Sequence, residues 1–131
     1  MTSRLLTPLA IALVTFIATA LAPANAAEMM LRGGTFTPAK GEKAGGTVAI
    51  VKDGDVTKLV LKDDFMLSAT PDAKLGFGKD GYIKGTIFSK LTKNDGMQEY
   101  TLPASVDLSK YNEVWIWCEQ FNVPLAMAKL N

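Results

Sequence analysis

The most reactive side chain in this 131-residue sequence belongs to a single cysteine, Cys118. A lone cysteine cannot form an internal disulfide. In an oxidising compartment it is therefore buried, paired with another molecule, or reactive. The sequence contains no histidine. It lacks the usual general base, the usual zinc ligand and the usual haem ligand for this reason.

Cys118 ends an apolar segment whose pattern predicts a β-strand. Side chains alternate between the two faces of a strand, so Val114 and Ile116 share the face of Cys118. Trp115 and Trp117 lie on the other face. This pattern favours a small buried hydrophobe. It also allows a redox or partner-linking thiol at the strand end, although no nearby lysine or arginine in the sequence would stabilise a thiolate.

Other kinds of chemical site find less support in the sequence. Without histidine, a blue-copper site and a Ser-His-Asp or Cys-His grouping cannot form. Enzymatic activity is left open, with no catalytic grouping to support it, and no metal site is predicted. The adjacent carboxylates Asp63 and Asp64 are typical of a solvated turn. The cofactor is unknown, and the remaining alternatives are copper(I) held by Cys118 with methionines, or haem with a cysteine, methionine or tyrosine ligand.

Residues 1–26 have the three parts of a secretory signal peptide. Arg4 supplies a positive start, residues 5–22 are mostly apolar, and small residues precede a cleavage site after Ala26. A membrane anchor is the alternative, but the apolar run is slightly short for a helix that spans a bilayer. We expect cleavage after Ala26, a secreted or periplasmic protein, and no stable membrane span in residues 27–131.

The charge balance argues against nucleic acid as a partner. The chain has 14 basic and 13 acidic residues, and loss of Arg4 with the signal peptide leaves the two signs equal. Binding to a phosphate backbone requires a basic excess. The length of the remaining chain, residues 27–131, suits a single domain whose core needs no disulfides.

Residues 27–131 have the pattern of an all-β domain. Short β-branched runs separated by turn residues, at spacings of about 8–12 residues, are typical of a small antiparallel β-sandwich or a barrel-like domain. The clearest signal is a hairpin around Asp53-Gly54-Asp55. The expected strands are residues 29–38, 47–52, 56–61, 74–78, 82–88, 87–91, 97–102 and 111–118. Residues 111–118 are expected to be the last strong strand. A helical turn is expected near residues 106–110.

Aromatic residues offer one further kind of site. Tyr100, Tyr111, Trp115 and Phe121 could form a surface that binds a sugar or a partner protein. Because large aromatic side chains dominate the cores of small domains, we expect them to pack inside the β domain instead.

The most specific motif in the sequence is Ile116-Trp117-Cys118 with Phe121 after it. It is accompanied by Gly34-Thr35-Phe36, Gly46-Thr47-Val48, Asp63-Asp64-Phe65, Pro71-Asp72, residues 96–103, Val106-Asp107-Leu108, Tyr111 and residues 114–124. Together these segments closely resemble the DM-thirteen domain, also called the electron-transfer DM domain, which occurs beside DOMON domains. The resemblance covers nearly all of residues 27–131.

The resemblance implies an all-β extracellular domain with a redox or electron-transfer role. That role falls on Cys118, with Trp117 and Phe121 as its immediate surroundings. Two departures from the family pattern stand out. Many relatives have a histidine in the loop that is residues 40–45 here, and this chain has none. Relatives also have an aliphatic or aromatic run where residues 74–78 contain two glycines.

Two functions follow from these observations. The first is an exported redox or electron-transfer accessory domain that acts through Cys118, surrounded by Trp115, Trp117 and Phe121, together with a redox partner protein. The second is a non-catalytic extracellular or periplasmic binding module in which Cys118 is structural.

Overall fold

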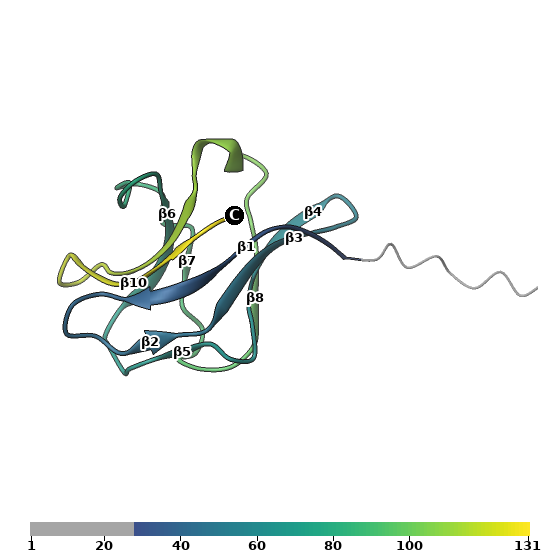
Figure 1. Ribbon diagram of the computed structural model, residues 1–131. Coiled ribbons are helices and arrows are strands. Elements are labelled where there is room, and N and C mark those ends of the chain that lie inside the picture. The colour runs from purple at the N-terminus through teal and green to yellow at the C-terminus, as the bar shows by residue number, and fades with distance from the viewer. Residues whose placement is uncertain (1–27) are drawn as a thin grey trace, which may run out of the picture.

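The computed structural model describes residues 28–131, in which β-strands and one short 3-10 helix alternate with turns (Figure 1). Eight strands form one sheet in the order β7-β6-β9-β10-β1-β3-β4-β8. In chain order their bounds are β1 (Met29–Pro38), β3 (Thr47–Asp53), β4 (Val56–Leu61), β6 (Ala73–Gly78), β7 (Ser89–Lys90), β8 (Gln98–Thr101), β9 (Glu113–Cys118) and β10 (Val123–Lys129). The short strands β2 (Ala44–Gly45) and β5 (Met66–Leu67) pair with each other. The predicted signal peptide, residues 1–26, lies outside the described residues.

The eight-stranded sheet is antiparallel and curls into a nearly closed barrel (Figure 1). Its two edge strands, β7 and β8, are connected by side-chain hydrogen bonds to the loop between them. The backbone N–H of Thr92 donates to the Tyr100 hydroxyl at 2.8 Å, and that of Lys93 donates to Gln98 Oε1 at 3.1 Å. The side chains of Gln98 and Tyr100 are buried. The prediction of an all-β, barrel-like fold is therefore confirmed.

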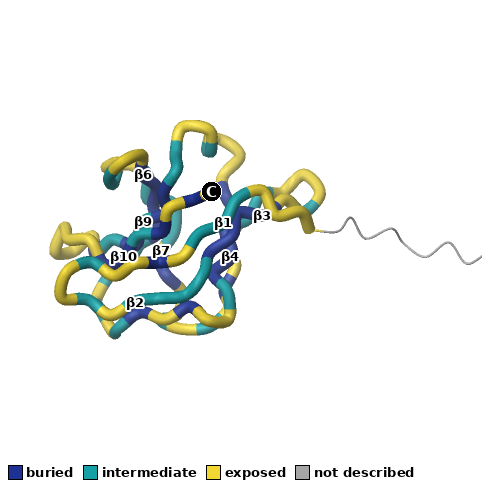
Figure 2. The backbone as a smooth tube through the Cα atoms, viewed as in Figure 1, coloured by how far each residue is buried: buried dark blue, intermediate teal, exposed yellow. Residues whose placement is uncertain are grey.

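The core consists of apolar side chains that face the inside of the barrel. Figure 2 shows buried segments along the strands and exposed segments mainly at the turns. The largest fully buried side chains are Phe65, Phe77, Ile50, Leu59, Leu61, Leu75, Ile116, Leu125, Val48, Val114 and Cys118. Burial of this much apolar surface, at roughly 25 cal/mol per Å², is the main source of stability for such a fold.

Several predicted elements are confirmed. β3 and β4 form the expected hairpin, with Asp53 opposite Val56 across a turn that contains Gly54 at φ +60°. A type of turn with positive φ matches the right-handed twist of the strands, and glycine adopts it without strain. The predicted strands at residues 29–38 and 111–118 correspond to β1 and β9, and the helical turn is Leu108–Lys110.

The prediction that residues 111–118 are the last strong strand is wrong. β10 follows and lies in the middle of the sheet, between β9 and β1. Pro124 concealed this strand, because proline cannot donate a ladder hydrogen bond and argues against a central position. The register shifts between Pro124 and Ala126, and a bulge of this kind accommodates a residue without an N–H.

The predicted strand at residues 82–88 is also wrong. Tyr82 forms one bridge to Gly78, after which the chain leaves the sheet at Gly85, whose φ is +89°. The Thr86 hydroxyl then bonds to both the N–H and the carbonyl oxygen of Phe77, at 2.9 Å each. The Thr86 side chain therefore takes the place of a neighbouring strand as hydrogen-bond partner of Phe77 on β6.

No helix in the part of the chain that the structure describes is long and apolar enough to cross a membrane.

Candidate functional site

Cys118 is the last residue of β9 and faces the interior of the barrel. Val114 and Ile116 precede it on the same face, and Cys118 itself is 1% exposed. The predicted alternation of faces is confirmed. The thiol donates a hydrogen bond to the carbonyl oxygen of Pro71, with an Sγ–O distance of 3.2 Å. The sulfur is thus enclosed and bonded to backbone.

A loop, residues 68–72, encloses Cys118 at this end of the barrel. The N–H of Ser68 donates to the carbonyl of Lys43 at 2.8 Å, which holds the start of the loop. Within the described residues, the buried hydroxyl of Thr70 has no hydrogen-bond partner. A buried hydroxyl without a partner carries a desolvation cost of about 1–3 kcal/mol. At the other end of the loop, the carbonyl oxygen of Asp72 accepts the N–H of Glu119 at 3.3 Å.

The two tryptophans of β9 lie on the opposite, outer face, together with Tyr82. We call Tyr82, Trp115 and Trp117 the outer aromatic cluster. The rings of Tyr82 and Trp117 stack with centroids 4.1 Å apart and planes 12° apart. Trp115 meets Trp117 edge-on at 6.2 Å and Tyr82 at 6.3 Å. The strand backbone separates this cluster from the thiol of Cys118.

Two glycines on the outer face of β6 make room for this cluster. Gly76 is the cross-strand partner of Trp115. A Cβ at Gly76 would lie 3.2 Å from Cε2 of Tyr82, and one at Gly78 would overlap the indole nitrogen of Trp115. The glycines that depart from the family pattern therefore provide the space that these rings occupy.

Hydrogen bonds hold both indoles in place. Trp115 Nε1 donates to Glu113 Oε2 at 2.7 Å, and the same oxygen accepts the N–H of Gly81 at 2.9 Å. Glu113 is only 5% exposed. Trp117 Nε1 donates to Asn122 Oδ1 at 3.2 Å. One indole is therefore bonded to a buried carboxyl group and the other to an amide.

Charged side chains border the cluster on the side of Trp117. Lys74 lies 3.2 Å from both Glu119 and Asp72. Its hydrogen bonds to Glu119, and then to Asp72, raise the pKa of Lys74 above its ordinary value. Burial raises the pKa of Tyr82, and the Glu119 carboxylate adds to that shift. Both shifts favour a protonated phenol and a charged lysine at neutral pH.

The cluster borders two shallow hollows. One, of about 280 Å³, is lined by Tyr82, Lys84, Gly85, Ile87, Trp117, Glu119 and Asn122. The other, of about 210 Å³, is mostly apolar and is lined by Thr37, Pro38, Ala39, Trp115, Pro124, Ala126 and Met127. A molecule that approaches this face of the barrel can therefore reach either tryptophan.

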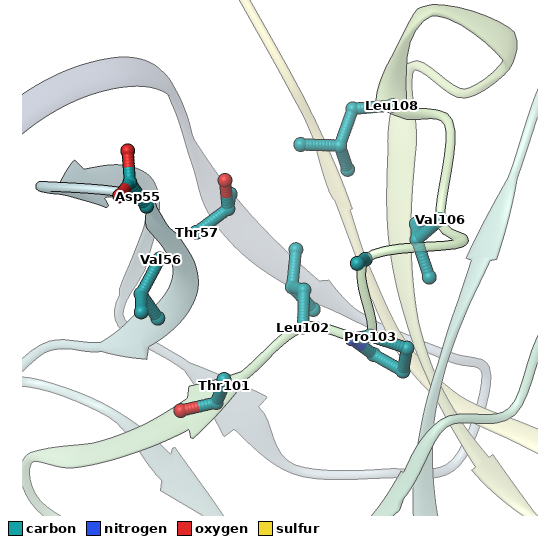
Figure 3. A pocket seen from close by; sticks show the side chains of 9 residues that line it. Asp55, Val56, Thr57, Thr101, Leu102, Pro103, Val106 and Leu108 are labelled. Carbon is teal, nitrogen blue, oxygen red and sulfur yellow. The ribbon is translucent and has the colours of Figure 1, made fainter.

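Figure 3 shows a third hollow, of about 290 Å³. It opens between the β3–β4 turn and residues 101–108, and its side chains are mostly aliphatic. Asp55, Thr57 and Thr101 are its polar side chains (Figure 3). None of the predicted site residues lines this hollow. Its one carboxylate and two hydroxyl groups do not make up a catalytic triad or a Cys-His pair.

The other predicted aromatic residues are divided between core and surface. Tyr100 is buried, and Tyr111 stacks on Phe77 with ring centroids 5.2 Å apart. Core packing is thus confirmed for these two. Phe121 is instead 62% exposed in the turn after β9, and Trp115 lies on the outer face. The structure brings Trp115 and Trp117 together and leaves Phe121 apart from them.

The contacts of Cys118 give no support to a cluster of the common metal ligands within the described residues. Among residues 28–131, no three side chains of the His, Cys, Asp or Glu types converge as metal ligands do. The Cys118 thiol is enclosed and already bonded to Pro71.

Sequence reasoning missed Tyr82 and Glu113 as members of the outer site. The sequence contained one signal for each of these residues. Gly76 and Gly78 occupy outward positions of a strand, and outward glycines indicate that another group approaches closely. Glu113 lies two residues before Trp115, so both share a strand face. What the pattern did not reveal is which aromatic ring would cover the glycines.

Comparison with protein families places the chain among known domains. The family model described as Electron transfer DM13 matches residues 35–130. The search of curated proteins and the search of solved structures each gave no match. The matched range contains β9 with Cys118, the covering loop and the outer aromatic cluster. This chain belongs to the electron transfer DM13 family.

Proposed function

We propose that this protein is an exported redox accessory domain in which Cys118 exchanges electrons with a partner protein by thiol–disulfide exchange. One observation carries the proposal. The only thiol of a chain in an electron-transfer family lies at a strand end, beneath a loop with a hydrogen-bonding defect. Export is supported by the signal-peptide pattern of residues 1–26.

The proposed step is a simple exchange of bonds. Cys118 loses its proton, and its sulfur attacks one sulfur of a partner disulfide. The disulfide of the partner breaks, and the leaving sulfur takes up a proton as a thiol. The product is a mixed disulfide between Cys118 and the partner.

Access to the sulfur requires displacement of residues 68–72. Local opening of a loop costs less free energy than global unfolding, because it breaks only the contacts of the loop. A closed loop also protects an exported thiol, because oxidation beyond the disulfide level follows exposure. Burial of Cys118 thus limits the reaction to conditions that open the loop.

A second function, a non-catalytic binding module with a structural cysteine, is favoured by one observation. Cys118 is 1% exposed and its thiol bonds to the Pro71 carbonyl. These features are also typical of a cysteine that serves as a small core hydrophobe. The reactivity of the thiol in the folded protein distinguishes the two functions.

The test is to purify the protein from its exported compartment without reductant and to measure its reaction with glutathione disulfide. We expect a chain that begins at Ala27, as mass spectrometry would show. We also expect a mixed disulfide at Cys118 that forms faster than global unfolding allows. Its rate should depend only weakly on low denaturant concentrations, as for local opening.

Two variants serve as controls. Cys118→Ser keeps a donor for the Pro71 carbonyl, so it should fold and should not react. Ala69→Cys, combined with Cys118→Ser, places a thiol at an exposed position of the loop. Its reaction with glutathione disulfide gives the rate for a thiol that is freely accessible. If Cys118 reacts only at the rate of global unfolding, the redox proposal is wrong and the binding module is the better function.

A further inference from the structure

The rings of the outer aromatic cluster are spaced closely enough for one-electron transfer. The centroids of Tyr82 and Trp117 are 4.1 Å apart, and Trp115 lies 6.2 Å from Trp117. Electron tunnelling between π systems falls steeply with the gap between them, so these rings form a continuous path. A hollow of about 280 Å³ beside Tyr82 and Trp117 gives a partner access to one end of the path.

A proton acceptor distinguishes the two tryptophans. Loss of an electron makes an indole N–H acidic, and a base within hydrogen-bond distance can take the proton. Trp115 Nε1 donates to Glu113 Oε2 at 2.7 Å, whereas Trp117 Nε1 donates to the amide oxygen of Asn122 at 3.2 Å. A carboxylate accepts a proton far more readily than an amide does. Of the two tryptophans, Trp115 is therefore the one at which an electron vacancy is more stable.

Glu113 is enclosed where it meets the Trp115 indole. Its side chain is 5% exposed, and both donors to Oε2, the Trp115 indole and the Gly81 N–H, are neutral. Glu113 Oε2 is therefore the proton acceptor within hydrogen-bond distance of the Trp115 N–H, and its enclosure keeps solvent from competing for that proton. Glu119, which is exposed and lies beside Lys74, is not in this position.

We propose that the outer aromatic cluster is a one-electron relay that ends at Trp115 and Glu113. A high-potential metal centre of a redox partner removes one electron through Tyr82 or Trp117, and the Trp115 N–H proton moves to Glu113 Oε2. The products are a neutral indolyl radical at Trp115, a protonated Glu113 and a metal centre reduced by one electron. Return of the electron from that centre reverses both transfers. The relay rests on the redox role proposed above and adds a route that does not use the sulfur of Cys118.

The test uses the full exported chain with Cys118→Ser, so that thiol chemistry cannot contribute. A ruthenium polypyridyl complex, photo-oxidised in solution, serves as the metal oxidant, and transient absorption follows the radical. The neutral indolyl radical and the protonated radical cation have different visible spectra. We expect the neutral radical to form in this parent protein without dependence on buffer concentration.

Three variants locate the electron vacancy and the proton. Glu113→Gln preserves an acceptor for the indole N–H but removes the base, so the radical cation should lose its proton about a hundredfold more slowly. Trp115→Phe should leave a long-lived radical cation at Trp117. Trp117→Phe should still give the neutral radical at Trp115, because the Tyr82 ring lies 6.3 Å from that of Trp115 and provides a direct route.

Glu99→Gln is the matched control, since it makes the same change at an exposed carboxylate of β8 that lines neither of the two hollows beside the cluster. It should leave the radical spectrum and lifetime unchanged. The relay is refuted if Glu113→Gln gives the spectrum and lifetime of the parent while near-ultraviolet circular dichroism shows an intact cluster. If Glu113→Gln does not fold, the Trp115→Phe variant provides the test. A neutral radical that forms in Trp115→Phe as fast as in the parent protein would refute the relay. Neither result bears on the reactivity of Cys118, which is measured separately.

Discussion

Gly78 lies on the outer face of β6, where its missing side chain leaves the space that the Trp115 indole occupies. The indole nitrogen in turn bonds to Glu113, whose carboxyl group also accepts the N–H of Gly81. A glycine, an indole and a buried carboxyl group thus depend on one another at a single point of the sheet. Inner-face residues such as Cys118 are positioned differently, by the tight packing of the barrel core.

Gly78→Ala should destabilise the protein, because the new Cβ would overlap the Gly81 carbonyl oxygen and the indole nitrogen of Trp115. We expect a loss of about 1–3 kcal/mol in the free energy of unfolding, typical of overpacking. Urea denaturation measures the loss, and near-ultraviolet circular dichroism should show altered tryptophan packing. Gly45→Ala is the control, because its new methyl group would have no heavy atom of another part of the chain within 4 Å. Equal stability of the two variants would contradict this account of the cluster.

At the scale of elements, single side chains hold the ends of strands to the loops beside them. Asp64, in the turn after β4, accepts hydrogen bonds from the backbone N–H and the hydroxyl of Thr47, both at 2.9 Å. Thr47 begins β3, so this carboxylate fixes the start of the central hairpin. The hydrogen bond from the Thr47 N–H, followed by that from its hydroxyl, lowers the pKa of Asp64.

The stability contributed by Asp64 should depend on pH in the acid range. Because the pKa is lower in the folded than in the unfolded protein, the contribution is present above the ordinary value of 3.8. It is lost as the pH falls through the folded value. Asp64→Asn should therefore be less stable than the parent at neutral pH, with a difference that disappears in acid. Denaturation series of both proteins at several pH values measure this difference, and a difference that persists unchanged in acid would contradict the role of the Asp64 carboxylate.

At the scale of the molecule, the barrel is closed by side chains rather than by a complete ladder of backbone bonds. β7 and β8 are the edges of the sheet, and the buried pair Gln98 and Tyr100 on β8 bonds to the loop that leads from β7. Unpaired strand edges invite association with other chains. The network therefore both closes the core and covers an edge.

Tyr100→Phe should weaken this closure. The change removes the acceptor for the N–H of Thr92, an exposed residue whose N–H water can then reach, so the expected cost is that of one hydrogen bond, about 0.5–1.5 kcal/mol. Chemical denaturation measures the loss, and amide hydrogen exchange at Thr92 should accelerate. Thr101→Val, at an exposed position of the same strand, is the control and should leave both measurements nearly unchanged. An unchanged exchange rate in Tyr100→Phe would show that closure does not depend on the hydroxyl.

Much of the local structure is determined by the sequence itself. The hairpin around Gly54, the strand that ends at Cys118 and the opposite faces of Cys118 and Trp117 all follow from residue types and a period of two. These features depend on neighbours in the chain, so they can be predicted without the fold. The family motif around Cys118 is equally a property of the sequence, and it identified the family correctly.

The tertiary structure alone decided which distant residues meet. Tyr82 stacks on Trp117 because β6 lies beside β9, and Pro71 reaches Cys118 for the same reason. The central place of β10 depends on a bulge at Pro124 that a pattern of single residues conceals. Contacts of this kind arise from strand order and from the curl of the sheet, which follow from the packing of the whole core rather than from any local period.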